Sequence, residues 1–163
     1  SGQMNYSLVG RDAEHDVIPF MQYAGISMTV WSPLAGGFLS GKYTRDNLKD
    51  AKNRLSGFDL LPFDKELGFQ IVDKMREIAE NYDASVAQIS LAWLLSKPVV
   101  ASIILGASKL HQLEDNLKAI EIELSDTEIA ELDAMTAIKP LYPHWFNQNL
   151  VDTKHKAIFN PAE

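Results

Sequence analysis

The sequence predicts an α/β fold with a parallel sheet, and three observations lead to this prediction. Segments with strand character alternate along the chain with segments of helical periodicity, which is the pattern of right-handed β-α-β units. The last strand segment, residues 99–105, is a continuous apolar run, typical of a parallel strand covered on both faces. Only three strand segments are convincing, and so small a parallel sheet has open edges. We therefore expect an incomplete sheet.

The first half of the chain contains two strand segments and one helix. Residues 3–8 have the composition of a short strand. Asp12 is expected to cap the next helix, and Pro19 inside that helix predicts a kink or a second start. Residues 26–31 are the clearest strand because they are rich in β-branched and aromatic side chains. Residues 32–63 form a long connection that contains several glycines, and connections of this length are usually functional.

The second half is mostly helical. One segment shows apolar residues at steps of three or four, and the next is apolar on most sides, as a buried helix is. Ser125 and Glu128 have the spacing of a capping box at the start of the final helix. We expect helices at residues 64–81, 86–96, 110–120 and 125–135, followed by an irregular tail.

Composition excludes several classes of protein and site. The 163 residues are 46% hydrophobic and 23% charged, as in ordinary globular domains. A net charge of −7 argues against binding to nucleic acid or to an anionic membrane. The chain has no cysteine, which excludes disulfides and thiolate metal sites, and its histidines lack metal-ligand spacing. No membrane-spanning apolar run and no secretory signal are recognisable, so we expect a cytoplasmic protein.

Three motifs in order give the sequence a specific resemblance. Residues 3–8 read Gln-Met-Asn-Tyr-Ser-Leu, residues 31–37 read Trp-Ser-Pro-Leu-Ala-Gly-Gly, and residues 104–109 read Ile-Leu-Gly-Ala-Ser-Lys. This series resembles the sixth, seventh and eighth strands of aldo-keto reductases and the loops that follow them. The resemblance implies a (β/α)₈ TIM barrel, of which residues 1–136 supply the C-terminal half. Residues 137–163 are then an irregular C-terminal tail.

The first two motifs can be interpreted in two ways. From the residues alone, Gln3 is a strand-end amide, Trp31 is a core aromatic and the glycines form an ordinary turn. The resemblance implies that Gln3 contacts the nicotinamide carboxamide and that Trp31 stacks on the nicotinamide ring. It also implies that the next loop binds the pyrophosphate, with Lys42 either holding this loop or remaining a solvated charge. The predicted contacts of the loop are Ser32, Pro33, Leu34 and Gly36.

The third motif gives the predicted adenosine end of the site. The resemblance implies that Lys109 and Ser108 bind the 2′-phosphate of NADPH at the N-terminus of a helix. Two positions depart from the family pattern, because Leu105 stands where proline is frequent and Lys109 where arginine is common. Lysine lacks the bidentate fork of arginine, so the choice between NADPH and NADH stays open here.

The helix after Lys109 carries polar residues on one face. By spacing alone this is a solvated polar face. The resemblance implies that Gln112 lies beside the adenine or the phosphate, that Asn116 meets the adenine edge, and that Asp115 steadies a basic side chain or the ribose. The complete predicted adenosine set is Gly106, Ala107, Ser108, Lys109, Gln112, Asp115 and Asn116.

No residue of this chain is predicted to be catalytic. Carbonyl reduction needs a proton donor near the developing alkoxide, and the resemblance places the family's tyrosine, lysine, aspartate and histidine before Gln3. The predicted function is therefore NADPH-dependent reduction of small aldehydes and ketones, with this chain as a cofactor-binding fragment that is inactive alone. Two alternatives stay open. Voltage-gated potassium channel beta subunits resemble the same motifs, which would make the chain a non-catalytic, nucleotide-sensing regulatory subunit. The other alternative is a naturally truncated paralogue.

The incomplete sheet is also expected to need a cover. Uncovered apolar surface of this kind marks an interface, so we expect an oligomer or a missing N-terminal half to lie over it. The side chains predicted to lie partly without partners are Met4, Tyr6, Met28, Val30, Ile103 and Leu105.

Overall fold

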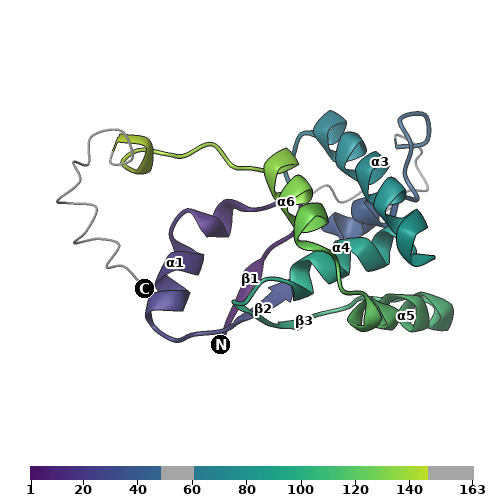
Figure 1. Cartoon of the computed structure of the whole chain (residues 1–163), viewed down its shortest axis with the longest axis horizontal. Helices are drawn as coiled ribbons and strands as arrows, with labels where there is room; N and C mark the ends of the chain where they lie inside the picture. Colours follow the sequence, from purple (N-terminus) through teal and green to yellow (C-terminus); the bar gives the residue numbers. More distant parts are fainter. Residues whose placement is uncertain (49–60, 147–163) are drawn as a thin grey trace.

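A three-stranded parallel sheet organises the molecule (Figure 1). The computed structural model describes residues 1–48 and 61–146. Its strands are β1 (Gly2–Asn5), β2 (Met28–Trp31) and β3 (Val100–Ile103), hydrogen-bonded in that order and parallel throughout. The predicted α/β class is confirmed, and the open sheet with surrounding helices is consistent with part of a (β/α)₈ barrel.

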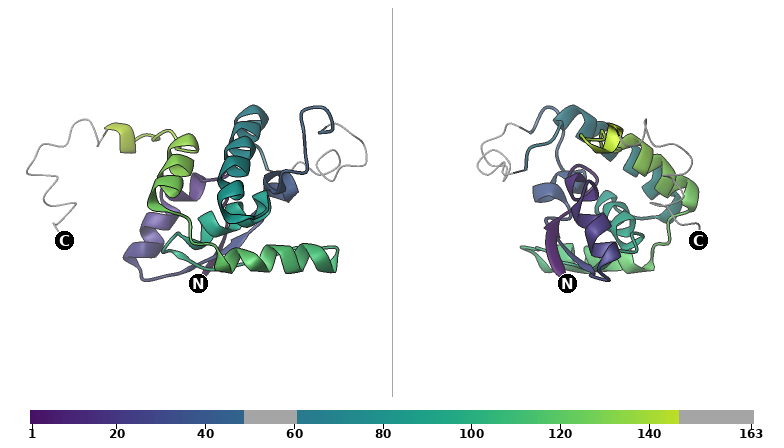
Figure 2. Two further views of the ribbon diagram at one scale, coloured as in Figure 1. Left: turned by 45° about the vertical axis from the view of Figure 1, so that its right-hand side comes forward. Right: turned by 90° about the vertical axis from the view of Figure 1, so that its left-hand side faces the viewer.

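Three helices gather on one side of this sheet, as Figures 1 and 2 show for α3, α4 and α6. Nearly every side chain of α4 is buried, as the apolar residues on most of its sides predict. Helix α5 lies lower, beside the sheet rather than over it. The α-helices are α1 (Val17–Tyr23), α3 (Lys65–Tyr82), α4 (Val86–Leu95), α5 (Leu110–Leu117) and α6 (Asp126–Met135), and the 3-10 turns are η1 (Asp12–Glu14), η2 (Ala35–Ser40) and η3 (Lys118–Glu121).

Side chains alternate between the two faces of the sheet, and only one set is covered. Met28 and Val30 are 0% exposed beneath the helices. Gln3 and Trp31, on the alternate positions, are exposed. One prediction was therefore wrong for three residues, because Tyr6, Met28 and Val30 are buried in the core. The other residues expected to lie partly without partners are partly buried and pack against that core: Met4, Ile103 and Leu105. The side chains at the alternate positions lie on the open face of the sheet, where Trp31 has polar neighbours.

Side-chain caps fix the starts of the long helices. The Asp64 carboxylate accepts hydrogen bonds from the backbone N–H groups of Glu66 (2.9 Å) and Leu67 (3.1 Å) at the start of α3. Ser125 and Glu128 form the predicted capping box of α6, with the Ser125 N–H 2.9 Å from Glu128 Oε2. These bonds satisfy donors that the first turn of a helix leaves unpaired.

Helix α1 begins after the residue expected to cap it. Asp12 lies in η1, and Asp16 occupies the N-cap position of α1 without a side-chain hydrogen bond. The predicted capping role of Asp12 was wrong. Pro19 lies in the first turn of α1, where its missing N–H is not needed, so a single helix accommodates it.

Other segments depart from the expected bounds. The first strand stops at Asn5 because Ser7 and Gly10 pair with each other in a tight turn, at 3.1 and 3.0 Å. The helix expected over residues 110–120 changes to a 3-10 turn at Lys118. Parts of the long connection and of the tail, residues 49–60 and 147–163, lie outside the described residues.

A polar junction joins the segment after β1 to the helix layer. Arg11 donates to both carboxylate oxygens of Glu14 (2.7 and 2.9 Å), to the hydroxyl of Thr136 (2.6 Å) and to the carbonyl of Asp133 (2.9 Å). The Tyr6 hydroxyl donates to the same Glu14 carboxylate at 2.6 Å. One guanidinium therefore connects η1 to the end of α6.

The same polar junction continues into α4 through Trp93. The indole N–H of Trp93 donates to the Asp133 carboxylate at 3.0 Å, and the Lys97 ammonium approaches both oxygens of that carboxylate at 2.7 Å. The cations of Arg11 and Lys97 lie 5.5 and 4.5 Å from the Trp93 ring centroid, within the range of cation–π attraction. The charged groups of Arg11, Lys97 and Asp133 thus join η1, α4 and α6, which are distant in sequence.

Candidate functional site

The strands of the sheet end at a common edge. Asn5 stands opposite Trp31 in the parallel register, and Val30 stands opposite Ile103. The segments that follow the three strands therefore leave the sheet from the same edge. In parallel α/β folds this carboxyl edge is where ligands bind. Most residues that the sequence predicts for the site lie in the segments after β2 and β3.

Trp31 ends β2 on the open face of the sheet. Its side chain is 40% exposed, although a tryptophan after an apolar strand would ordinarily be buried. Gln3 is exposed on the neighbouring strand, two positions before Asn5. The Asn5 amide donates to the carbonyl of Trp31 at 3.4 Å and so ties the ends of the two strands. An accessible aromatic face and an exposed amide therefore lie on neighbouring strands of one face.

The loop after Trp31 has an unusual backbone. Pro33 is buried and Leu34 packs against the core, so their side chains face the protein interior. Non-glycine residues rarely adopt positive φ, and such positions gather at ligand sites. At the start of the loop, positive φ occurs at Ser32 (56°), Ala35 (47°), Gly36 (67°) and Gly37 (90°).

Lys42 lies over this glycine turn. Its side chain is exposed, with the ammonium 4.8 Å from the Tyr43 ring centroid. A Cβ atom placed on Gly37 would lie 2.9 Å from the Lys42 ammonium nitrogen, so a side chain at position 37 would displace the ammonium. The structure therefore brings a cation to the loop that the sequence predicts as the pyrophosphate site.

The start of α5 forms a second, separate group, which we name the α5 rim and define as Ser108, Lys109 and Gln112. The Gln112 side-chain oxygen accepts from the Ser108 N–H (3.3 Å) and from the Ser108 hydroxyl (3.2 Å). Lys109 is the N-cap residue of α5, and its side chain is exposed and makes no capping bond. Gly106 and Ala107 before it are exposed as well. The predicted adenosine residues thus surround an accessible helix N-terminus.

The other two predicted residues of α5 face the protein. Asn116 is buried. The Asp115 carboxylate accepts from the Ser85 hydroxyl and from the Gln88 amide, both at 2.8 Å. We name Ser85, Gln88 and Asp115 the α4–α5 clamp. Sequence reasoning missed the partners of Asp115, and the capping-box spacing of Ser85 and Gln88 was the one local signal that marked them.

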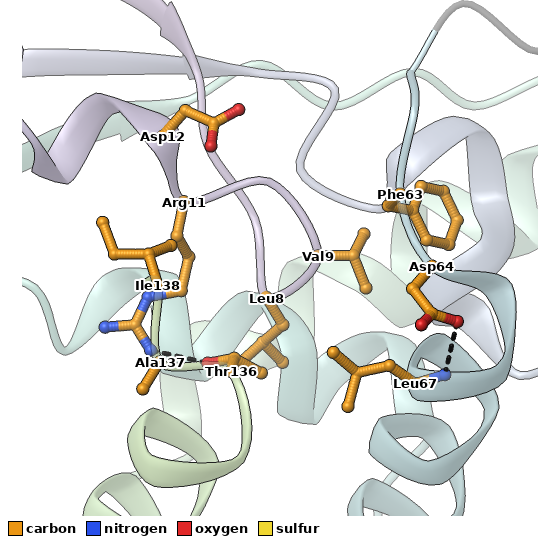
Figure 3. Close-up of a pocket in the computed structure, with 10 residues that line it drawn as sticks. All are labelled: Leu8, Val9, Arg11, Asp12, Phe63, Asp64, Leu67, Thr136, Ala137 and Ile138. Carbon is orange, nitrogen blue, oxygen red and sulfur yellow. Dashed lines mark hydrogen bonds between the residues drawn. The ribbon is translucent and has the colours of Figure 1, made fainter. Parts of the chain in front are cut away.

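A cavity of about 190 Å³ lies elsewhere, between the segment after β1, the start of α3 and the segment after α6 (Figure 3). Leu8, Val9, Leu67 and Ile138 supply apolar walls, and Arg11 turns its guanidinium toward Thr136. No residue that the sequence predicts for the nucleotide site lines it. The cavity and the candidate site are therefore different places.

Tyr6 is unsuited to act as a proton donor. Burial, together with the hydrogen bond to the Glu14 carboxylate, raises the pKa of its hydroxyl far above the ordinary value. A general acid needs a pKa near the working pH. Within the described residues, 1–48 and 61–146, no group of three or more His, Asp or Glu side chains is arranged to hold a metal.

The described part of the chain also contains no helix that is both long and apolar enough to span a membrane.

Comparison with known proteins agrees with this architecture. Residues 1–137 match the model of the Aldo/keto reductase family. An uncharacterized oxidoreductase of Mycobacterium tuberculosis is 38% identical over 158 residues, which is 94% of this chain and 47% of that protein. A Schizosaccharomyces pombe protein named as a putative voltage-gated potassium channel subunit beta is 35% identical over 147 residues, covering 85% of this chain and 42% of its own length.

A solved structure shares the arrangement in space. It is a thermostable aldo-keto reductase, Tm1743, in complex with the inhibitor epalrestat, with 33% sequence identity and a TM-score of 0.58. The match covers 82% of this chain and 38% of that one. The chain thus spans less than half the length of these proteins.

Proposed function

The chain belongs to the aldo/keto reductase family, and from that premise we propose that it binds NADPH as part of an enzyme that reduces small aldehydes and ketones. One observation carries the proposal. The carboxyl edge of the sheet places an exposed Trp31 and a lysine-covered glycine turn on one loop, and the next parallel strand leads to an exposed lysine at a helix start. A dinucleotide offers matching chemistry, namely a flat ring followed by phosphates.

The nicotinamide end is assigned to the open face of the sheet. Trp31 provides an aromatic surface for the ring, and Gln3 provides both a donor and an acceptor for the carboxamide. When bound, the cofactor supplies the hydride that reduces the carbonyl carbon. The role of this chain is to hold and orient that cofactor.

The phosphates are assigned to the two cationic groups. Lys42 and the backbone of the Ser32–Gly37 turn receive the pyrophosphate, since turns that contain residues at positive φ can form concavities of backbone N–H groups that bind anions. Lys109 and Ser108 receive the 2′-phosphate at the N-terminus of α5, where the helix dipole adds to the attraction. Because Lys109 is exposed at the start of α5, its charge is accessible to that phosphate.

Catalysis requires residues that this chain is not proposed to supply. Tyr6 is buried and bonded to Glu14, and the tyrosine, lysine, aspartate and histidine of the family have no assigned counterpart here. The open face, with its exposed Gln3 and Trp31, is proposed to be covered by the remaining strands of a barrel or by another copy. The isolated chain is therefore proposed to bind NADPH without turning over a carbonyl substrate.

A second function is favoured by the similarity to the S. pombe protein named as a potassium channel subunit beta. A regulatory subunit uses nucleotide binding to report the cofactor's state rather than to reduce a substrate. This alternative needs the same nucleotide site. It differs only in the consequence of cofactor binding, which is regulation rather than reduction of a substrate.

Fluorescence titration with NADPH tests the proposal. Energy transfer from tryptophan, with Trp31 nearest the proposed ring, should rise to saturation as NADPH is added. Trp31→Leu should remove most of this signal, whereas Trp145→Leu, on the segment after α6, should leave it. The absence of saturable NADPH binding would refute the proposed function. Efficient aldehyde reduction by the purified chain would refute the proposal that this chain does not supply the catalytic residues.

A further inference from the structure

The backbone on both sides of the Lys42 Cα atom is held by side chains. The carbonyl of Gly41 accepts a hydrogen bond from Arg76 Nη2 at 3.1 Å. The carbonyl of Lys42 itself accepts from the side-chain amide of Asn47 at 3.3 Å. Because each peptide unit is planar, fixing the two units that flank a Cα atom also fixes the direction in which its side chain leaves the backbone. These two bonds therefore set the direction of the Lys42 side chain.

Arg76 connects this backbone to helix α3. Its Nη1 donates to the Asp73 carboxylate at 2.6 Å, one turn earlier on the same helix. The planar guanidinium offers its donors in a rigid fork, so one group can hold a helix carboxylate and a loop carbonyl together. Asn47 instead belongs to the loop, where its side-chain oxygen accepts from the Thr44 N–H at 2.8 Å. The bond from Arg76 thus relates Lys42 to the helix layer.

Gly41 is also confined from the side of α4. Its φ is 73°, and a Cβ atom placed on it would lie 3.2 Å from a methyl carbon of Val86, at the start of that helix. The Gly41 backbone therefore packs on α4 while α3 holds its carbonyl through Arg76. At the far end of the Lys42 side chain, the ammonium lies beside the Gly37 turn and 4.8 Å from the Tyr43 ring centroid.

We propose that Arg76 is a positioning residue, whose bond to the Gly41 carbonyl places the Lys42 ammonium over the glycine turn. Its effect on nucleotide affinity rests on the proposed function, because the pyrophosphate is assigned to Lys42 and this turn. A lysine side chain loses conformational entropy when a ligand immobilises it, and a lysine that is already in place loses less. NADPH and NADH share the pyrophosphate, so the positioning should favour both cofactors equally.

Nuclear magnetic resonance of the ligand-free chain tests the positioning itself. The ring current of Tyr43 shifts protons that lie over the ring, so the ε-methylene signal of Lys42 reports this contact, and its loss in Lys42→Ala identifies it. Arg76→Ala should move the signal toward that of a free lysine. Arg45→Ala is the matched control, because Arg45 also links the loop to α3, through a glutamate, and its removal leaves the Gly41 carbonyl bonded to Arg76. An unchanged signal in Arg76→Ala, or equal shifts in both variants, would overturn the proposal.

Fluorescence titration of the same variants tests the consequence for binding. Arg76→Ala should weaken NADPH and NADH alike by about fivefold, the weight of one exposed hydrogen bond, whereas Arg45→Ala should retain the affinity of the unaltered chain. In a chain that already carries Lys42→Ala, Arg76→Ala should cause no further loss, because it acts through Lys42. The same loss with and without Lys42, or an equal loss in Arg45→Ala, would refute the positioning role. If the unaltered chain binds neither cofactor, the proposed function fails, and the Lys42 signal still decides whether Arg76 positions it.

Discussion

The polar junction around Arg11 and the α5 rim around Lys109 use similar side chains in opposite settings. The Arg11 side chain is 11% exposed, and its donors meet Glu14, Thr136 and the Asp133 carbonyl. Lys109 is exposed at a helix start and makes no capping bond. A buried cation must be paired with protein groups because desolvation is costly. A cation at an accessible helix start keeps its hydration and can exchange it for a ligand.

The comparison teaches where stability and recognition reside. The polar junction connects η1, α4 and α6, so its loss should appear as a lower free energy of unfolding. The α5 rim projects from a helix with one buried side chain, so its loss should appear as a lower affinity for nucleotide. Substitutions in the two regions test whether stability and nucleotide affinity are separated in this way.

Arg11→Ala should cause a large loss of stability. It leaves the Glu14 carboxylate beside Tyr6 without its cation and removes the group that donates to the Thr136 hydroxyl. Breaking a largely buried ion pair in this way should lower the free energy of unfolding by about 3 kcal/mol. Urea unfolding followed by far-ultraviolet circular dichroism measures the change.

Arg45→Ala is the control for Arg11→Ala. Arg45 also pairs with a glutamate, Glu66, but their side chains are 53% and 60% exposed. Because solvent screens such a pair, the free energy of unfolding should hardly change. Equal losses from the two arginine variants would show that burial does not distinguish the polar junction.

Leu94→Ala and Leu113→Ala compare the two regions with one chemical change. Leu94 on α4 is 0% exposed, and Leu113 on α5 is 37% exposed. Truncation of a buried leucine costs about 2–5 kcal/mol, through lost burial and a residual cavity. We expect that loss for Leu94→Ala, and less than about 1 kcal/mol for Leu113→Ala. A large loss for Leu113→Ala in the isolated chain would mean that α5 contributes to the core.

Lys109→Ala should affect binding and leave stability unchanged. Removing one charge-assisted contact to the 2′-phosphate should weaken NADPH by about 1.5–3 kcal/mol and leave NADH nearly unaffected. Lys118→Ala, in η3 behind α5, controls for the loss of one positive charge. Equal weakening of both cofactors, measured by fluorescence titration, would place Lys109 away from the phosphate.

Glu128→Gln should give the smallest change in the free energy of unfolding, and this change should depend on pH. Burial alone would raise the pKa of Glu128, but hydrogen bonds from Tyr82 and Ser125 lower it below the ordinary value of 4.5. The unfolded state therefore binds the proton more tightly, so the contribution to stability is present above pH 4.5 and is lost as pH falls through the lower folded pKa. At pH 7 the wild type should be the more stable protein by less than about 1 kcal/mol, because solvent screens these bonds.

Chemical unfolding across a pH series checks this expectation. The difference between wild type and Glu128→Gln should shrink once the pH falls below 4.5. Glu80→Gln, on the exposed side of α3, should show no such convergence. A difference that stays constant down to acid would mean that the charge of Glu128 contributes nothing.

The sequence by itself determined the elements and the local features of the site. Helical periodicity and capping pairs such as Ser125 and Glu128 predict helices because the interacting residues are three or four apart. The glycine turn after Trp31 and the lysine at the start of α5 are equally local. Each of these features directly follows a strand segment, and the carboxyl ends of parallel strands meet at one edge. The sequence therefore suffices to assign both loops to the same edge of the sheet.

Only the tertiary structure decided which face of the sheet is covered and which partners the polar side chains take. A strand alternates its faces, and the sequence did not reveal which set the helices would cover, so the prediction for Met28 and Val30 was wrong. Asp115 finds Ser85 and Gln88 at separations of 30 and 27 residues, and Arg11 finds Thr136 at a separation of 125. No local pattern records such pairs, because they form only when packing brings the helices together.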